Sequence, residues 1–312
     1  MSERKEVEHE ITVSAPAAEV YRLIADVANW PRIFPPTIYV DHLERSGNEE
    51  LIGIWATANG DAKNWTSRRV LDPDGLRITF RQTVSTPPVA SMGGGWIIEP
   101  LGAGTARIRL LHDYTAVDDD PAGLAWIDEA VDRNSRSELA ALKTNVELAT
   151  ASEELTFSFE DTVEVDGSAK DLYDFVNEAD RWSERLPHVA TVRLTEDTPG
   201  LQTLEMDTRA KDGSTHTTKS YRVCLDGRKI AYKQTTLPAL MNLHTGYWTF
   251  RETDAGTFAS SQHTVVLRPE NIEKILGPDA GVAEARSYVQ GALSTNSRAT
   301  LNHAKAYAEA RR

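Results

Sequence analysis

The chain has 312 residues, of which 40% are hydrophobic and 26% charged, and its formal net charge is −13. This length predicts about two domains of roughly 150 residues, each large enough to bury a core and enclose a cavity. The negative charge argues against nucleic-acid binding, because no basic run exceeds two residues. No apolar run reaches the roughly 18 residues of a membrane span, and Met1–Glu6 lacks the apolar core of a secretory signal, so a cytoplasmic protein without membrane contact is expected.

The first half begins with a strand and two short helices. Apolar and polar residues alternate from Val7 to Val13, which is the period of a half-buried strand. A helix follows Pro16, and Asn29-Trp30-Pro31 ends it and starts a second helical turn. Alternating segments between turn residues then predict antiparallel strands over 37–45, 50–58, 63–71, 76–84, 95–99 and 105–116. Apolar residues at helical spacing predict a closing helix from about 121 to 149.

The second half repeats the first. Trp30 recurs as Trp182 and Trp96 as Trp248, both 152 positions later, which indicates an internal duplication. The repeat predicts a long helix near 280–310 and strands over 156–165, 189–196, 201–210, 215–225, 229–236, 246–252 and 258–268. We therefore expect an N-terminal domain over 1–151 and a C-terminal domain, a divergent copy, over 152–312.

The order of strands and helices in each copy predicts an α+β fold. A strongly curved, seven-stranded antiparallel sheet would grip a long C-terminal helix, with two short helices beside it. Two such helix-grip domains in tandem are the expected architecture. Where sheet and helix do not meet fully, a deep apolar pocket is expected, so functional residues are sought among inward-facing polar side chains.

Strand 63–71 carries the first inward polar pair. Trp65 and Leu71 mark its interior face, and alternation places Ser67 and Arg69 on the same face. An inward guanidinium costs several kcal/mol to desolvate unless an anionic or strongly hydrogen-bonding group meets it. A cavity with a polar ligand would meet that need, and so would a buried Glu or Asp or a place on the rim in water.

Strand 105–116 carries a second inward pair, His112 and Tyr114, which share a face with apolar residues. A lone inward histidine is most often a hydrogen-bonded core residue. Ser67 and Arg69 on the same sheet favour a functional role instead.

The closing helix and the tryptophans add candidate ligand contacts. Asn134, Ser135 and Glu138 interrupt the apolar stripe of the helix, so at least one should face the pocket. Asn134 is the candidate, and the alternative is a polar residue on the helix flank. The tryptophans are either ordinary core or walls for a flat, unsaturated ligand that can stack, and in this half they are Trp30, Trp65 and Trp96.

The residues give little support for a disulfide, a metal site or a phosphate-binding loop. The single cysteine, Cys224, cannot form an intrachain disulfide, and the eight histidines lack metal-ligand spacing, so no metal site is expected. The run Met92-Gly93-Gly94-Gly95 is not followed by the Lys-Ser/Thr of a phosphate-binding loop.

These residues together resemble a known family. The run Trp30-Pro31-Arg32-Ile33-Phe34, the inward Trp65-x-Ser67-x-Arg69, Trp96 and Asn134 are similar to the bacterial aromatic-polyketide aromatase/cyclases of the START/Bet v 1-like superfamily. Met241-Asn242-Leu243-His244 in the second half is also similar, so the chain resembles a didomain aromatase/cyclase of type II polyketide biosynthesis.

The resemblance implies a cofactor-free enzyme. It would receive a poly-β-ketone on an acyl carrier protein, close the first ring by an intramolecular aldol reaction and dehydrate that ring to an aromatic one. For the didomain branch the resemblance implies a chain already reduced at carbon 9 and closure between carbons 7 and 12. Other polyketide synthase subunits would be partners. Because of the net charge of −13, an acidic carrier protein would have to dock on a local basic patch.

Within that family's reaction, three residues are expected to be catalytic. Arg69 stays protonated and would polarise a ketone or enolate oxygen, while His112 would carry protons. Ser67 would hydrogen-bond a carbonyl or an ordered water. Substrate contacts are expected from Trp30, Phe34, Trp65, Trp96, Tyr114 and Asn134. Thr37 stands where some single-domain relatives carry an aromatic hydroxyl, which weighs against a tyrosine-assisted step.

The second copy is expected to differ at the site. With the 152-residue offset its strand reads Thr217, Lys219, Tyr221, which loses Trp, Ser and Arg together. His263 aligns with His112 only after a one-residue shift. The N-terminal pocket is therefore expected to hold the chemistry, and a second pocket would involve Trp182, Tyr221, Trp248 and His263.

Two other classes of function stay open on the sequence. The first is a non-catalytic carrier for a lipid or polyketide, which would not need an Arg-Ser-His set. The second is a chaperone-associated binding module, which predicts a filled interior instead of a cavity.

Overall fold

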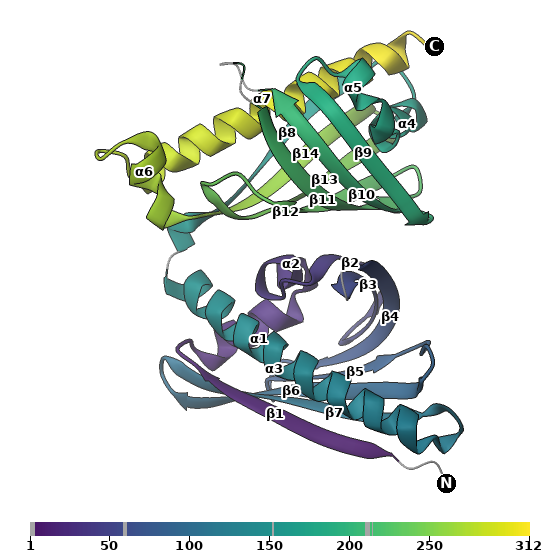
Figure 1. The fold of residues 1–312 in the computed structure, drawn as a ribbon, viewed down its shortest axis with the longest axis vertical. Coiled ribbons are helices and arrows are strands. Elements are labelled where there is room, and N and C mark those ends of the chain that lie inside the picture. The colour runs from purple at the N-terminus through teal and green to yellow at the C-terminus, as the bar shows by residue number, and fades with distance from the viewer. Residues whose placement is uncertain (1–3, 59–60, 152, 210–212, 214) are drawn as a thin grey trace. The chain divides into compact units, whose positions relative to one another are not determined.

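The structure is a computed structural model that describes residues 4–58, 61–151, 153–209, 213 and 215–312 (Figure 1). The chain divides into two compact units, Met1–Ala151 and Ser152–Arg312. Each unit carries one seven-stranded antiparallel sheet and one long helix. The predicted fold class, two tandem helix-grip domains, is confirmed.

The N-terminal unit has its strands in the order β1-β7-β6-β5-β4-β3-β2. Their bounds are β1 (Lys5–Val13), β2 (Thr37–Ser46), β3 (Glu49–Ala58), β4 (Asp61–Asp72), β5 (Arg77–Gln82), β6 (Val89–Gly102) and β7 (Thr105–Ala116). Two short helices lie between β1 and β2 in the chain, α1 (Ala17–Ala25) and α2 (Trp30–Ile33), and the closing helix is α3 (Pro121–Ala151).

The C-terminal unit repeats this topology with the order β8-β14-β13-β12-β11-β10-β9. Its strands are β8 (Thr156–Val165), β9 (Val189–Thr198), β10 (Leu201–Arg209), β11 (Thr215–Leu225), β12 (Lys229–Thr236), β13 (Met241–Thr253) and β14 (Gly256–Leu267). Its helices are α4 (Ala169–Asn177), α5 (Trp182–Arg185), α6 (Ile272–Leu276) and α7 (Val282–Glu309), and α7 lies along the sheet (Figure 1).

The core of each unit lies between the sheet and its helices. In the N-terminal unit, Val20, Leu23 and Ile24 of α1 share a buried cluster with Leu142 and Val146 of α3. These positions recur at helical spacing, so each helix turns one apolar face inward. The corresponding cluster of the C-terminal unit joins α4, the sheet and the end of α7.

The glycine-bearing strand is longer than the sequence predicts in both units. β6 begins at Val89 instead of residue 95, and β13 begins at Met241 instead of 246. A Cβ on Gly94 would lie 1.9 Å from the carbonyl oxygen of Leu111 on β7. The glycines therefore permit a close approach between strands, although such a run in a sequence is usually typical of a loop.

Candidate functional site

Arg69 is buried on the inner face of β4, and its charge is met by protein groups. Its side chain is 1% exposed, and Nη2 donates to Glu50 Oε1 at 2.8 Å. Its guanidinium also donates to the carbonyl oxygens of Ile24 and Ala25, at 3.2 and 2.7 Å, and lies 5.2 Å from the ring of Trp30. Burial lowers the pKa of Arg69, and the Glu50 carboxylate opposes that shift. Its Nε–H is buried without a hydrogen-bond partner among the described residues.

The neighbouring candidates of the N-terminal unit are one polar and several aromatic side chains. Ser67 is buried and its Oγ donates to the carbonyl oxygen of Arg81 at 3.2 Å. Trp65 is partly buried on the same face of β4, packed beside Val40 and Ile54. The aromatic rings of Trp30, Phe34 and Trp96 are consecutive neighbours, with centroid separations of 5.4 and 5.8 Å.

His112 lies further across the same sheet and contacts the closing helix. Its Nδ1 is 3.4 Å from Ser135 Oγ on α3, and its ring packs edge-on against Phe80. Burial, with a smaller contribution from His9, lowers the pKa of His112 to about 4, so the imidazole is neutral at neutral pH. A neutral imidazole can accept a proton, which a permanently charged guanidinium cannot do.

The other candidates on β7 and α3 range from fully buried to exposed. Tyr114 is fully buried, and its hydroxyl donates to Asp128 at 2.5 Å. Asn134 has an exposed side chain, and it is Ser135, next to it on α3, that is buried against His112. Burial raises the pKa of Glu138 to about 7, which gives α3 a carboxyl group able to hold a proton near neutral pH.

The expected loss of the serine and arginine from the second copy is wrong. Arg222 on β11 lies 5.2 Å from the ring of Trp182, as Arg69 does from Trp30, and it donates to the carbonyl oxygen of Val176 at 2.6 Å. Ser220 stands two residues before it, as Ser67 precedes Arg69. The true offset on this strand is 153 residues, and among the three only Trp65 is replaced, by Thr218.

Cross-strand pairing makes this correspondence explicit. In each unit five residues stand opposite one another on successive strands, and we call these sets the cross-strand rows. The N-terminal row is Glu50, Arg69, Phe80, Gly94 and His112. The C-terminal row is Gln202, Arg222, Tyr232, Gly246 and His263. His263 is therefore the counterpart of His112, at an offset of 151 residues.

Arg222, Tyr232 and His263 of the C-terminal row line a cavity of about 420 Å³. Apolar side chains dominate its wall, among them Trp182, Leu204, Trp248 and Leu293. Polar side chains come mainly from β11–β14 and from α7, and they include Ser220, Arg222, Tyr232, Gln234, His244, His263 and Ser297. A mostly apolar cavity of this size with a few convergent polar groups is typical of a small-molecule site.

Two imidazoles and one phenol form a buried network in this cavity. His244 Nε2 lies 3.0 Å from His263 Nδ1, and the Tyr232 hydroxyl lies 2.9 Å from His263 Nδ1 and 3.3 Å from His244 Nε2. Gln234 Oε1 is 2.9 Å from His244 Nδ1, and Ser261 Oγ is 3.1 Å from His263 Nε2. Burial lowers the pKa of His244 to about 3 and that of His263 to about 4, and it raises the pKa of Tyr232.

Of the residues predicted for the second pocket, Trp182, Trp248 and His263 line this cavity. Tyr221 lies between Ser220 and Arg222 on β11, so its side chain points to the opposite face of the sheet. Arg222, Tyr232 and His244 were not among the predicted site residues. The one-residue change in offset concealed Arg222, and His244 was part of the family-like run Met241–His244 without a role of its own.

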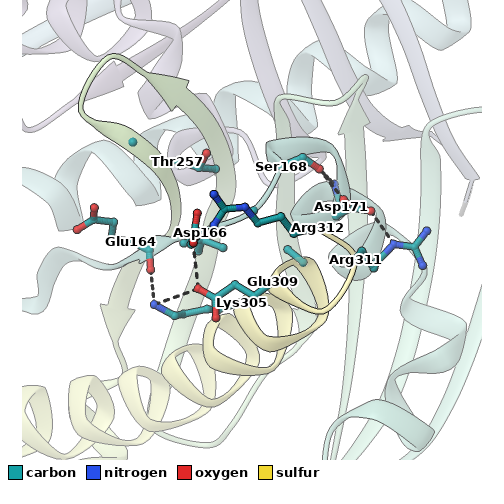
Figure 2. A pocket seen from close by; sticks show the side chains of 13 residues that line it. Glu164, Asp166, Ser168, Asp171, Thr257, Lys305, Glu309, Arg311 and Arg312 are labelled. Carbon is teal, nitrogen blue, oxygen red and sulfur yellow. Dashed lines mark hydrogen bonds and ion pairs between the residues drawn. The ribbon is translucent and has the colours of Figure 1, made fainter.

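A second hollow on the C-terminal unit, of about 590 Å³, is lined mostly by charged and polar residues. Figure 2 shows Lys305 beside Glu309 and Arg311 beside Asp171, two ion pairs near the end of α7. Lys305 Nζ donates to the carbonyl oxygen of Glu164 at 2.7 Å, and Arg311 Nε donates to Asp171 at 2.8 Å. Because these charges are already paired and largely exposed, this hollow offers no desolvated group for chemistry.

Within the described parts of the chain, no group of three or more His, Cys, Asp or Glu side chains is arranged to hold a metal ion. No helix in the same parts is long and apolar enough to cross a membrane.

Fold and cavity together define a class: a tandem helix-grip protein with inward-facing polar groups in both sheets. The family described as polyketide cyclase/dehydrase and lipid transport matches residues 4–147 and, separately, residues 156–309. The granaticin polyketide synthase bifunctional cyclase/dehydratase of Streptomyces virginiae is 61% identical over 296 residues, which cover 95% of this chain and 97% of that protein. The actinorhodin polyketide synthase bifunctional cyclase/dehydratase of Streptomyces coelicolor is 46% identical, covering 97% of this chain and 96% of its own length.

A solved structure with a similar sequence and fold supports the same family. The di-domain aromatase/cyclase BexL from the BE-7585A biosynthetic pathway matches with a TM-score of 0.93 and 68% identity, over 99% of this chain and 100% of that one. The chain belongs to the polyketide cyclase/dehydrase family, and the resemblance to didomain aromatase/cyclases is confirmed. It is an enzyme of the polyketide cyclase/dehydratase type.

Proposed function

We propose that this enzyme closes the first ring of a poly-β-ketone held on an acyl carrier protein and then removes water to make that ring aromatic. The names of the relatives, bifunctional cyclase/dehydratases of polyketide synthases, support both halves of this reaction. Reduction of the substrate at carbon 9 and closure between carbons 7 and 12 are part of the proposal. The observation that carries it is the set of inward polar groups, arginine, serine and histidine, in interiors otherwise lined by apolar and aromatic side chains.

Ring closure asks the enzyme to fold a flexible chain, stabilise an enolate and move protons in a site that excludes water. In the N-terminal unit, Arg69 would bind the ketone or enolate oxygen through its unpartnered Nε–H. Glu50 and the two backbone carbonyls hold the rest of the guanidinium in place. His112, neutral at neutral pH, would accept the proton lost from the reacting carbon.

The remaining predicted residues would shape the substrate. The hydroxyl of Ser67 already donates to Arg81, so its lone pairs would accept a hydrogen bond from a substrate hydroxyl or an ordered water. Trp30, Phe34, Trp65 and Trp96 would provide apolar and aromatic walls. Because the chain carries a net charge of −13, the acidic carrier protein would dock on a local basic patch.

The test is reconstitution with a minimal type II polyketide synthase, its carrier protein and a ketoreductase, using malonyl-coenzyme A. We expect His112→Ala to slow formation of the cyclised product by about 10²–10⁴-fold, the range for loss of a general base. Arg69→Lys keeps a positive charge beside Glu50 but cannot reproduce the guanidinium fork, and it should also be slow. The exposed neighbour Arg68→Ala is the control and should match the parent. If both site variants match the parent as well, neither Arg69 nor His112 takes part in ring closure, and the chemistry proposed for the N-terminal unit is wrong.

A further inference from the structure

The C-terminal cavity contains a hydrogen-bonded group of titratable side chains, and the roles proposed for Arg69 and His112 do not involve them. With Gln234 Oε1 accepting from His244 Nδ1, the other nitrogen of His244 is an acceptor. The Tyr232 hydroxyl can then donate to His244 Nε2 while it accepts from His263 Nδ1. Tyr232 is thus placed between a proton acceptor and a proton donor, which is the arrangement of a relay.

The close approach of these groups depends on Gly246. A Cβ at this position would lie 2.6 Å from the Tyr232 hydroxyl oxygen and 2.1 Å from the carbonyl oxygen of Gln262. The absence of a side chain lets the phenol ring cross β13 and reach His263 on β14. In the N-terminal row the ring of Phe80 crosses Gly94 in the same way, with 2.9 Å between Phe80 Cζ and a Cβ at Gly94. That ring brings no hydroxyl, and Met92 takes the place that His244 occupies in β13.

The buried arginine of this cavity has a different hydrogen-bond partner from the buried arginine of the N-terminal unit. Arg222 stands directly opposite Tyr232 in the β11–β12 ladder, so their Cβ atoms are about 4.5–5.5 Å apart. Its Nη1 donates at 2.8 Å to Gln202, a neutral amide, where Arg69 has the carboxylate of Glu50. A buried guanidinium paired with an amide keeps its charge available to an anion that forms in the cavity.

We propose that Tyr232, His244 and His263, facing Arg222, form a second catalytic centre, which dehydrates the cyclised β-hydroxy ketone. This assignment rests on the proposed function and names the site of its second step. The ligand class is a β-hydroxy ketone whose carbonyl oxygen lies toward Arg222.

The step is an elimination in two stages. The Tyr232 oxygen takes the proton from the carbon beside the ketone while its own proton moves to His244 Nε2, and the electron pair of the broken C–H bond forms an enolate whose oxygen Arg222 stabilises. The enolate then re-forms the ketone as the carbon–carbon double bond forms and the carbon–oxygen bond of the hydroxyl breaks. The departing hydroxyl takes a proton from Tyr232, and His244 returns its proton to Tyr232. One water is released and the enzyme groups regain their starting protonation.

The experiment uses the full chain with the poly-β-ketone made in situ by the minimal synthase and ketoreductase, and follows the products by mass spectrometry over time. We expect Tyr232→Phe and His244→Met, which copy Phe80 and Met92, to slow formation of the dehydrated product by about 10²-fold. A cyclised product heavier by one water should accumulate. Tyr247→Phe, which removes a hydroxyl from the outer face of β13, is the matched control and should behave as the parent.

Gln202→Glu is a second variant that does not remove any group of the relay. It places beside Arg222 the carboxylate that Arg69 has, so it should also slow dehydration. Because Gln202 Nε2 donates to Glu196 at 2.8 Å, the new carboxyl would meet that carboxylate, and the thermal unfolding of this variant is measured beside its activity. Dehydration at the parent rate in Tyr232→Phe and His244→Met would overturn the inference, and so would loss of cyclisation in these variants while His112→Ala cyclises normally. Absence of any cyclised product with the parent protein would instead overturn the proposed function.

Discussion

At the scale of single residues, the two cross-strand rows differ by changes that preserve shape and alter chemistry. Gln202 has the length of Glu50 without its charge, and Tyr232 has the ring of Phe80 with a hydroxyl added. The arginine, the glycine and the histidine of each row are the same. A duplicated framework has therefore kept its packing while the two rows hold different charged and different titratable groups.

The buried imidazoles should make stability depend on pH. The pKa values of His244 and His263 lie near 3 and 4 in the folded protein, against roughly 6.5 in an unfolded chain. Between pH 6.5 and 4 the unfolded chain binds protons that the folded unit does not, so the free energy of unfolding should fall as pH is lowered through this window. We expect His244→Met to reduce that dependence by up to about 1.4 kcal/mol per pH unit, measured by urea unfolding at pH 7 and below.

Tyr247→Phe is the control for this experiment, because it leaves every histidine in place. It should leave the pH dependence unchanged. An equal slope in the parent and in His244→Met would show that His244 is already protonated in the folded protein, and the neutral relay would then be wrong.

At the scale of strands and helices, alternation and turn residues were sufficient to predict the fold and the inward face of β4. Ser67 and Arg69 are buried there while Arg68 and Val70 are exposed, as the period of two requires. The partner of Arg69 could not be predicted, because Glu50 stands at the start of β3 after a run of exposed polar residues. Nothing local in the sequence distinguishes a buried glutamate at that point from a solvated one.

The second site could not be located for a different physical reason. The offset between the copies is 152 residues at both tryptophans, 153 at Arg222 and 151 at His263. Turns between strands gain or lose a residue at little cost, whereas a one-residue slip in pairing would turn every side chain to the other face. The rows are therefore preserved through strand pairing and not through distance along the chain, and only the structure shows the pairing.

Glycine positions provide a test at the scale of these elements. Gly246→Ala should lower the free energy of unfolding by about 1–3 kcal/mol, because a Cβ there collides with the backbone of β14 and with Tyr232. Gly291→Ala should raise it by about 0.5–1 kcal/mol, because this exposed glycine lies inside α7 with no atom close to its Cβ position. Thermal and urea unfolding of the full chain would measure both. A neutral Gly246→Ala would mean that β13 and β14 can separate without cost.

At the scale of the whole molecule, each unit contains a complete core and a complete cross-strand row. The family match likewise covers each half by itself. Neither row includes a residue of the other unit, so neither proposed centre requires a side chain of the other row to be formed. A substrate tethered to a carrier protein could therefore meet the two centres in succession on one chain or on two.

Complementation between two inactive chains tests this independence. His112→Ala disables the proposed cyclising centre and Tyr232→Phe the proposed dehydrating centre. Each variant alone should form aromatic product at least about 10²-fold more slowly than the parent. Mixed in equal amounts, they should approach the parent rate, because every step then has an intact centre that the carrier-bound intermediate can reach. Either variant at twice its concentration is the control and should stay slow. A mixture as slow as its components would show that the intermediate does not pass between chains, and that the two units act on a substrate retained by one molecule.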